Sequence, residues 1–292
     1  MPNRLPEWLK KRIPSGAHIT EGILEKFGLH TVCVSAHCPN RGECFSRSEA
    51  AFMILGNVCT RDCRFCAVKK GMPLPVDTGE PSRISAAAAA MGLKYVVITS
   101  VTRDDLEDGG ASQFAEVVKE LRKKFSGSIG IELLVPDFCG DRDALRLILS
   151  RDVTVLNHNL ETVRRLYPAV RRQADYSRSL ELLKTAKKER PGIITKSGLM
   201  LGLGEAFGEV AEAMQALRKS GCDFLTLGQY LRPGPGQIEV AEFITPGTFK
   251  RYEAEAYRMG FAAVASGPFV RSSYNALFMH KGAEKCLNSA RN

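Results

Sequence analysis

The feature that most constrains the fold is a sixfold alternation of short β-rich runs with longer amphipathic runs. The β-rich runs lie at residues 52–58, 95–100, 129–135, 153–157, 195–201 and 224–229. The segments between them space their apolar residues three and four positions apart, as at Phe114, Val117, Val118 and Leu121, which is the period of an α-helix. Repeated β-then-α units favour a parallel sheet with helices outside it. Six units fall short of a closed eightfold barrel, so we expect an α/β protein with a partial (β/α)6 TIM-type barrel and a site at the C-terminal ends of its strands.

The cysteines are distributed unevenly along the chain. Six of the nine fall between Cys33 and Cys66, and the other three, Cys139, Cys222 and Cys286, are isolated and are expected to be structural. Residues 1–14 are polar and lack the apolar centre of a secretory signal. No apolar run approaches the ~18 residues that cross a bilayer. We therefore expect a cytoplasmic protein with no membrane segment, in which the clustered cysteines serve metal or redox chemistry.

The stronger cysteine motif consists of Cys59, Cys63 and Cys66 in the spacing CxxxCxxC, directly after the first predicted strand. Three thiolates in this spacing can each reach a different iron of one [4Fe–4S] cluster. The fourth iron then has no protein ligand and can bind the amino and carboxylate groups of S-adenosylmethionine. The alternative is a zinc site, but zinc usually takes four ligands from two separated CxxC pairs. The spacing resembles the signature of the radical S-adenosylmethionine superfamily, which implies reductive cleavage of the sulfonium C–S bond to give a radical.

A second triplet, Cys33, Cys38 and Cys44, lies just upstream and predicts a second cluster. A loose structural zinc site or chance are the alternatives, although two triplets this close together argue against chance. The two triplets in this order resemble the lipoyl synthase family. The resemblance covers nearly the whole chain and is carried by residues 29–33, 38–44, 52–66, 103–110, 136–138, 157–162 and 267–274.

The resemblance to lipoyl synthases implies that the Arg-Ser-Ser-Tyr motif supplies the fourth ligand of the auxiliary cluster through Ser273. It implies two [4Fe–4S] clusters and S-adenosylmethionine as cofactors. The implied reaction is sulfur insertion at C6 and C8 of a protein-bound octanoyl-lysine, with the auxiliary cluster as the sulfur donor. The implied partners are octanoylated lipoyl carrier domains (2-oxoacid dehydrogenase E2 subunits and the glycine cleavage H protein), a reduced ferredoxin or flavodoxin, and an iron–sulfur cluster carrier.

Candidate contacts to S-adenosylmethionine come from the expected strand ends and from the cysteine motif itself. They are Phe65, Ser100, Asn157, Asn159, Glu161 and Gly202. Gly202 belongs to a segment that resembles the adenine-packing pattern of the superfamily. Asp104 and Asp105 either cap the next helix or bind ligand, and Arg271 either fixes the serine loop or meets substrate.

The chain is expected to have three parts. Residues 1–50 form an N-terminal extension with the auxiliary-cluster cysteines, residues 51–260 form the barrel, and residues 261–292 carry the Arg-Ser-Ser-Tyr motif. The two extensions together would hold the auxiliary cluster.

The net charge of +9 comes from many basic pairs and triplets rather than from one block. Each run alone is typical of a solvated helix face, whereas together they favour an acidic partner. Nothing in the sequence singles out a nucleic acid. Two other functions stay open at this point: a different radical enzyme with an auxiliary cluster, and a metal-binding module without catalytic activity.

Overall fold

The computed structural model describes residues 5–11 and 16–289, with side chains up to residue 282, so the side chain of Cys286 lies outside it. Its centre is an eight-stranded sheet in the order β1-β2-β5-β6-β7-β8-β9-β10. The strands are β1 (His30–Thr31), β2 (Ala51–Ile54), β5 (Tyr95–Ser100), β6 (Gly130–Leu134), β7 (Val155–Asn157), β8 (Ile194–Leu201), β9 (Phe224–Gln229) and β10 (Ala263–Gly267). All neighbouring pairs are parallel except β1 with β2.

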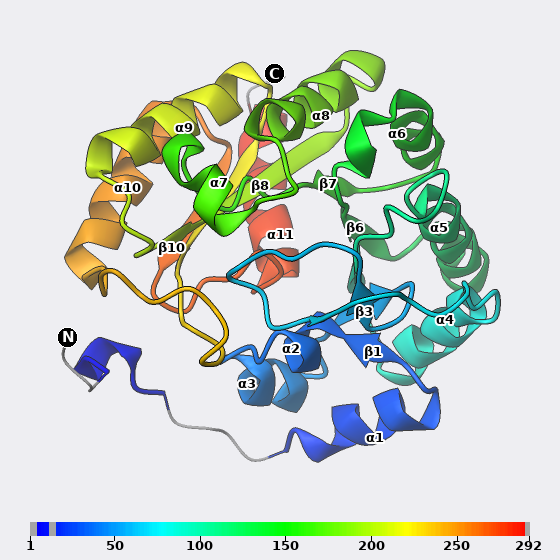
Figure 1. The fold of residues 1–292 in the computed structure, drawn as a ribbon. Coiled ribbons are helices and arrows are strands. Elements are labelled where there is room, and N and C mark those ends of the chain that lie inside the picture. Colours follow the sequence, from blue (N-terminus) through cyan, green and yellow to red (C-terminus); the bar gives the residue numbers. More distant parts are fainter. Residues whose placement is uncertain (1–4, 12–15, 290–292) are drawn as a thin grey trace.

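Helices cover the outside of this curved sheet (Figure 1). They are α4 (Glu80–Ala90), α5 (Ala111–Phe125), α6 (Arg142–Leu149), α7 (Tyr167–Val170), α8 (Tyr176–Glu189), α9 (Phe207–Lys219) and α10 (Pro246–Arg258), with the short 3-10 turns η2 (Phe138–Gly140) and η3 (Arg164–Leu166). In α5, Phe114, Val117, Val118 and Leu121 are all buried, because their spacing places them on one face. The expected partial barrel is confirmed.

Two strands of the sheet were not predicted. β10 adds a parallel strand beyond β9, and it lies past residue 260, where the expected barrel segment ends. Its sequence, Ala-Val-Ala-Ser-Gly, contains a single β-branched residue, so it carries little strand signal. β1 is only two residues long and pairs antiparallel with β2.

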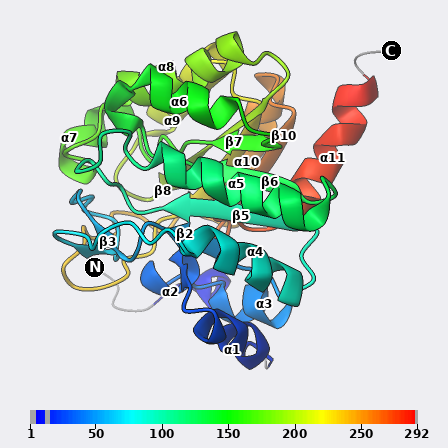
Figure 2. The same cartoon turned by 90° about the vertical axis from the view of Figure 1, so that its right-hand side faces the viewer.

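The two ends of the barrel are covered differently. Helix α11 (Ala276–Ser289) packs against β5 and β10, and Figure 2 shows it at the side of the sheet away from the cysteine loop. Tyr95 at the start of β5 contacts His280 of α11, with ring centroids 5.7 Å apart. The amino-terminal ends of the strands are therefore closed by the chain, which leaves their carboxyl ends for a site.

The N-terminal extension closes the open side of the barrel. It contains η1 (Glu7–Leu9), α1 (His18–Lys26), α2 (Val32–Ser35) and α3 (Arg41–Ser46). Through β1 it joins one edge of the sheet. At the other edge the Asn40 amide donates to the Phe269 carbonyl, 2.6 Å away, just after β10. The first and last segments of the chain thus meet beside the strand ends.

Candidate active site

A cavity of about 400 Å³ lies at the carboxyl ends of the strands. Residues from both extensions and from the barrel line it. Six of the seven predicted cluster ligands line the cavity: Cys33, Cys38, Cys59, Cys63, Cys66 and Ser273. The seventh, Cys44, lies outside the lining. The fold therefore brings five of the six clustered cysteines to one cavity with Ser273, which lies some two hundred residues further along the chain.

The loop that carries Cys59, Cys63 and Cys66 leaves β2 and forms a small parallel pair, β3 (Val58–Cys59) with β4 (Lys69–Lys70). Backbone N–H groups of Arg61 and Thr102 donate to the Cys59 sulfur over 3.5 and 3.3 Å. Such donors stabilise a negatively charged sulfur, as they do around iron–sulfur clusters. This observation fits a thiolate ligand at Cys59.

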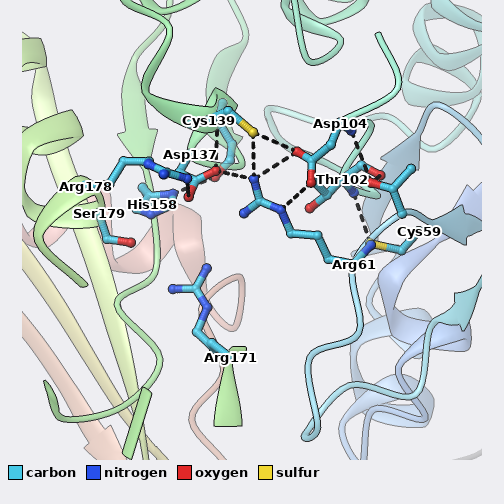
Figure 3. Close-up of polar contacts among 12 residues, drawn as sticks. Cys59, Arg61, Thr102, Asp104, Asp137, Cys139, His158, Arg171, Arg178 and Ser179 are labelled. Atoms are coloured by element: carbon cyan, nitrogen blue, oxygen red, sulfur yellow. Dashed lines mark hydrogen bonds and ion pairs between the residues drawn. The ribbon is translucent and has the colours of Figure 1, made fainter. Parts of the chain in front are cut away.

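Arg61, between the first two cysteines, anchors the loop to the barrel. Its guanidinium donates to Asp104 over 2.6 Å and to Asp137 over 2.6 Å, and its side chain is only 4% exposed (Figure 3). The Cys139 sulfur lies 3.3 Å from the same guanidinium. Burial alone would raise the pKa of Asp137, but the hydrogen bond and charge of Arg61 outweigh it and hold that pKa below its usual range. The buried Arg61 thus ties the loop to Asp104 in the turn after β5 and to the buried Asp137 in the turn after β6.

Burial also governs the thiols. It raises the pKa of Cys33 and of Cys66 to about 12, and it raises the pKa of Cys63. These thiols are protonated in the metal-free chain, and binding of iron would displace their protons. Among the described residues no three His, Cys, Asp or Glu side chains converge closely enough to bind a single metal ion. A [4Fe–4S] cluster spreads its thiolates over separate iron atoms, so it requires only that they surround a common space.

The second triplet lies on the N-terminal extension. Cys33 is on α2, whose N-cap Thr31 accepts from the Val34 N–H over 3.3 Å. Cys44 is on α3, where the Tyr274 hydroxyl donates to the neighbouring Glu43 carboxylate over 2.8 Å. The Arg-Ser-Ser-Tyr motif and α3 are therefore in direct contact, as a shared cluster site requires.

Four of the six candidate contacts to S-adenosylmethionine line the cavity: Phe65, Ser100, Asn159 and Glu161. The Ser100 hydroxyl is buried and has no hydrogen-bond partner in the described chain. A buried hydroxyl without a partner is costly, and a bound polar ligand would remove that cost. Ser100 and the acceptor-only carboxylate of Glu161 therefore fit a ligand with polar and cationic groups.

The other two candidates lie outside the cavity lining. The Asn157 amide nitrogen is bound by Glu132 and by Ser272, each over 2.8 Å. Gly202 has a φ of +97°, and its N–H donates to Glu205 over 2.5 Å. A Cβ at Gly202 would lie 2.3 Å from the Gln229 amide, so close packing accounts for this glycine.

The residues whose roles were open at the sequence level now have partners. Asp104 pairs with Arg61, and Asp105 accepts from Arg103 over 2.8 Å. Arg271 donates to the Val270 carbonyl over 2.7 Å, which favours fixing of its own loop. A different aspartate, Asp108, accepts from backbone N–H groups at the start of α5. Cys222 is buried in the core, whereas Cys139 is exposed.

Sequence reasoning missed two buried residues of the cavity. His158 accepts no hydrogen bond at Nε2 from the described chain, while its Nδ1 lies 2.9 Å from the Val135 carbonyl. Arg171 donates to the Asn159 carbonyl over 3.1 Å and to the Tyr167 hydroxyl over 2.9 Å. His158 lies between the two candidates Asn157 and Asn159, whereas no sequence signal pointed to Arg171. Only the fold brings these two side chains to the cavity.

The fold and the site define a class of protein. Residues 53–228 match the family model of the radical SAM superfamily, so the chain belongs to that superfamily. Among solved structures it is similar to Streptococcus suis SuiB bound to S-adenosylmethionine, with a TM-score of 0.55, 12% identity and coverage of 75% of this chain and 50% of that one. It is also similar to HydG, a maturase of the [FeFe]-hydrogenase, with a TM-score of 0.54, 13% identity and coverage of 84% and 62%. At these identities the likeness shows the fold alone.

Within the superfamily the chain belongs to the lipoyl synthases. It is 57% identical to the lipoyl synthase of Caldanaerobacter subterraneus subsp. tengcongensis over 94% of this chain and 96% of that protein. It is 50% identical to the lipoyl synthase of Alkaliphilus metalliredigens over 94% of each chain. The expected family, a radical S-adenosylmethionine sulfurtransferase, is confirmed. Membership implies S-adenosylmethionine and [4Fe–4S] clusters as cofactors, and two clusters are typical of this family.

Within the described part of the chain, no helix combines the length and the apolar character needed to cross a membrane.

Proposed function

We propose that this chain inserts two sulfur atoms, at C6 and C8, into an octanoyl group on a lysine of a lipoyl carrier domain. The observation that carries the proposal is the shared cavity, which is lined by five of the six clustered cysteines and by Ser273. One cavity allows a radical formed at one cluster to reach a carbon held against the other. The similarity to curated lipoyl synthases over nearly the whole chain supports the same reaction.

Cys59, Cys63 and Cys66 would hold the first [4Fe–4S] cluster, with one iron open for S-adenosylmethionine. Phe65, Ser100, Asn159 and Glu161 line the space beside these cysteines and are assigned to that ligand. Burial raises the pKa of Glu161, and the nearby Arg171 charge opposes this rise. The cationic amino group of the ligand would favour the ionised carboxylate further.

Cys33, Cys38, Cys44 and Ser273 would hold the auxiliary cluster. An alkoxide is a harder and poorer ligand than a thiolate for iron in such a cluster, which suits a cluster that gives up its sulfur. When bound, the cofactors supply the electron, the radical and the sulfur. The residues of this chain orient them, keep water away with the buried walls of the cavity, and hold the cysteine loop in place through Arg61.

The carrier partners would be octanoylated E2 subunits of 2-oxoacid dehydrogenases and the glycine cleavage H protein. The electron donor would be a reduced ferredoxin or flavodoxin, and an iron–sulfur carrier would rebuild the auxiliary cluster. The +9 charge supports docking of an acidic carrier domain. With these partners, the protein would act in the cytoplasm.

Mass spectrometry of an octanoyl-lysyl peptide tests the proposal. The reconstituted protein is incubated anaerobically with the peptide, S-adenosylmethionine and a reductant. We expect a lipoylated product, with two sulfurs in place of two hydrogens. An unchanged peptide beside abundant 5′-deoxyadenosine would show a radical enzyme with another substrate. An unchanged peptide without 5′-deoxyadenosine, from protein that contains iron, would favour a non-catalytic metal-binding module.

A further inference from the structure

Two adjacent serines in the loop after β10 have different surroundings. The Ser272 hydroxyl accepts from the Asn157 amide over 2.8 Å and donates to Asn159 Oδ1 over 2.8 Å. The Ser273 hydroxyl has no hydrogen-bond partner in the part of the chain that the structure describes, and Ser273 lines the cavity with the cysteines. Both hydrogen bonds of the Ser272 hydroxyl are thus made to the barrel, while the Ser273 hydroxyl can bind a ligand in the cavity.

The hydrogen bonds of Ser272 begin at a buried ion pair inside the barrel. Lys196 Nζ lies 2.9 Å from Glu132 Oε1, and both side chains are 1% exposed. The Tyr95 hydroxyl donates to the other Glu132 oxygen over 3.0 Å. A buried pair with further hydrogen bonds has a fixed geometry, because any loss of a partner leaves a charge without compensation.

This ion pair fixes the direction of every hydrogen bond that follows. Asn157 Nδ2 donates one hydrogen to Glu132 and the other to Ser272. A flipped amide would place its oxygen against the carboxylate, so only one orientation is allowed. Ser272 must therefore accept from Asn157, and its own proton goes to Asn159 Oδ1. Asn159 Nδ2 in turn donates to Glu161 over 3.1 Å.

We propose that Ser272 is the positioning residue of the auxiliary-cluster loop. Asn157 and Asn159 hold its hydroxyl, and this hold sets the place of the Ser273 hydroxyl in the cavity. The proposal rests on the proposed role of Ser273 as the fourth cluster ligand. According to this proposal, Ser272 binds the barrel through Asn157 and Asn159, and Ser273 binds the cluster.

The backbone leaves the loop little freedom elsewhere. A Cβ on Gly228 of β9 would lie 2.1 Å from the Val270 carbonyl oxygen, so the loop lies directly on that strand. Arg271 donates to the same carbonyl over 2.7 Å. The loop is thus held at two points: Val270 lies on β9, and Ser272 is bound by Asn157 at the end of β7. The next residue, Ser273, lines the cavity.

Iron release from the reconstituted full-length protein tests the proposal. A chelator is added anaerobically, and the loss of visible cluster absorbance is followed with time. A variant with Cys59, Cys63 and Cys66 all replaced by alanine identifies the phase that belongs to the auxiliary cluster. Ser272→Ala should speed that phase about tenfold, because two hydrogen bonds are lost. Asn157→Ala, which removes one of them, should speed it about threefold.

The controls separate this proposal from the one on which it rests. Ser272→Thr keeps the hydroxyl and should stay within about twofold of the parent protein. Ser266→Ala removes a hydroxyl of β10 that lies outside the cavity lining and donates to the Phe249 carbonyl of α10, and it should change nothing. If Ser273→Ala speeds the phase and both Ser272→Ala and Asn157→Ala do not, the positioning role is wrong. If Ser273→Ala itself has no effect, the assignment of Ser273 as ligand is wrong.

Discussion

Cysteines of both triplets line one cavity, yet the chain holds the two triplets by different means. The loop of Cys59, Cys63 and Cys66 is tied down by Arg61, whose side chain is 4% exposed and pairs with the fully buried Asp137. Beside Cys44, the corresponding pairs join Glu43 to Lys11 and Arg47, whose side chains are 22%, 23% and 41% exposed. Buried pairs are strongly coupled to folding, whereas exposed pairs contribute little.

The difference extends to the backbone. The first loop continues from β2 into the β3–β4 pair, and its Arg64 exchanges backbone hydrogen bonds with Val170 and Ile238 on both sides. The second triplet lies on two short helices, α2 and α3, that meet the end of the chain through side chains such as Asn40 and Tyr274. A permanent cofactor suits the first arrangement, and a cluster that is consumed and rebuilt suits the second.

The sharpest test of this comparison is the loss of one thiol from each triplet. Cys63→Ala should abolish the formation of 5′-deoxyadenosine from S-adenosylmethionine, because the cluster loses one of its three ligands. Cys38→Ala should keep this cleavage while ending sulfur insertion. Chromatography of 5′-deoxyadenosine and of the lipoyl product from the same reaction measures both. Cleavage by Cys63→Ala, or its loss in Cys38→Ala, would contradict the division of labour between the triplets.

The anchoring by Arg61 predicts the next largest effect. Arg61→Met leaves Asp137 buried without its close partner, so the free energy of unfolding should fall by about 3 to 5 kcal/mol. Urea unfolding of the metal-free protein measures this. Arg178→Met is the matched control, because Arg178 contacts the same carboxylate over 3.4 Å from a side chain that is 36% exposed. It should cost under about 1 kcal/mol. Equal losses in the two variants would show that burial of Arg61 does not matter.

The first triplet's side of the cavity should also show a pH dependence of stability. Burial, followed by the charge of Arg171, lowers the pKa of His158 from 6.5 to about 4. Between these values the unfolded chain binds the proton and the folded chain does not, so stability falls as the pH falls from 6.5 toward 4. The full difference is about 3 kcal/mol. Unfolding of the metal-free protein at several pH values measures it.

His158→Gln keeps an N–H donor for the Val135 carbonyl but does not titrate. Its stability should therefore change less than that of the parent over the same pH window. The quantity to compare is the slope of the free energy of unfolding against pH, because the substitution also alters packing and hence the absolute stability. Identical slopes for the two proteins would mean that His158 is not the group that titrates.

The sequence predicted the parts of the molecule that depend on local pattern. Two of the six strands, 95–100 and 224–229, have the bounds found in the structure. Ser273 was indicated by the resemblance to lipoyl synthases and not by local pattern, and it lies in the same cavity as five cysteines. The sequence did not predict β10, whose small residues form a strand only because β9 lies beside them. Nor did it predict that Asn157 turns inward, since its partners Glu132 and Ser272 are 25 and 115 residues away. Contacts of that range follow from the fold and not from spacing.

The smallest expected effect concerns the partly buried contacts of the second triplet. Tyr274→Phe removes the hydrogen bond to Glu43 but keeps the ring, over which Lys11 lies 5.6 Å from the centroid. Loss of one such bond should speed iron release from the auxiliary cluster about threefold at most, and should leave 5′-deoxyadenosine formation unchanged. Tyr257→Phe on α10, with its hydroxyl 3.4 Å from the Val264 carbonyl, is the control and should have no effect.

This last experiment decides whether weak surface contacts or the serine loop limit the lifetime of the auxiliary cluster. If Tyr274→Phe acts as expected, the α3 contact is part of what retains the auxiliary cluster. If iron release is unchanged, the Tyr274–Glu43 contact does not help to retain the cluster, and the Ser272–Ser273 loop becomes the main candidate. The second triplet would then be anchored from inside the barrel, as the first is, and the contrast between the two regions would lie only in their ligands.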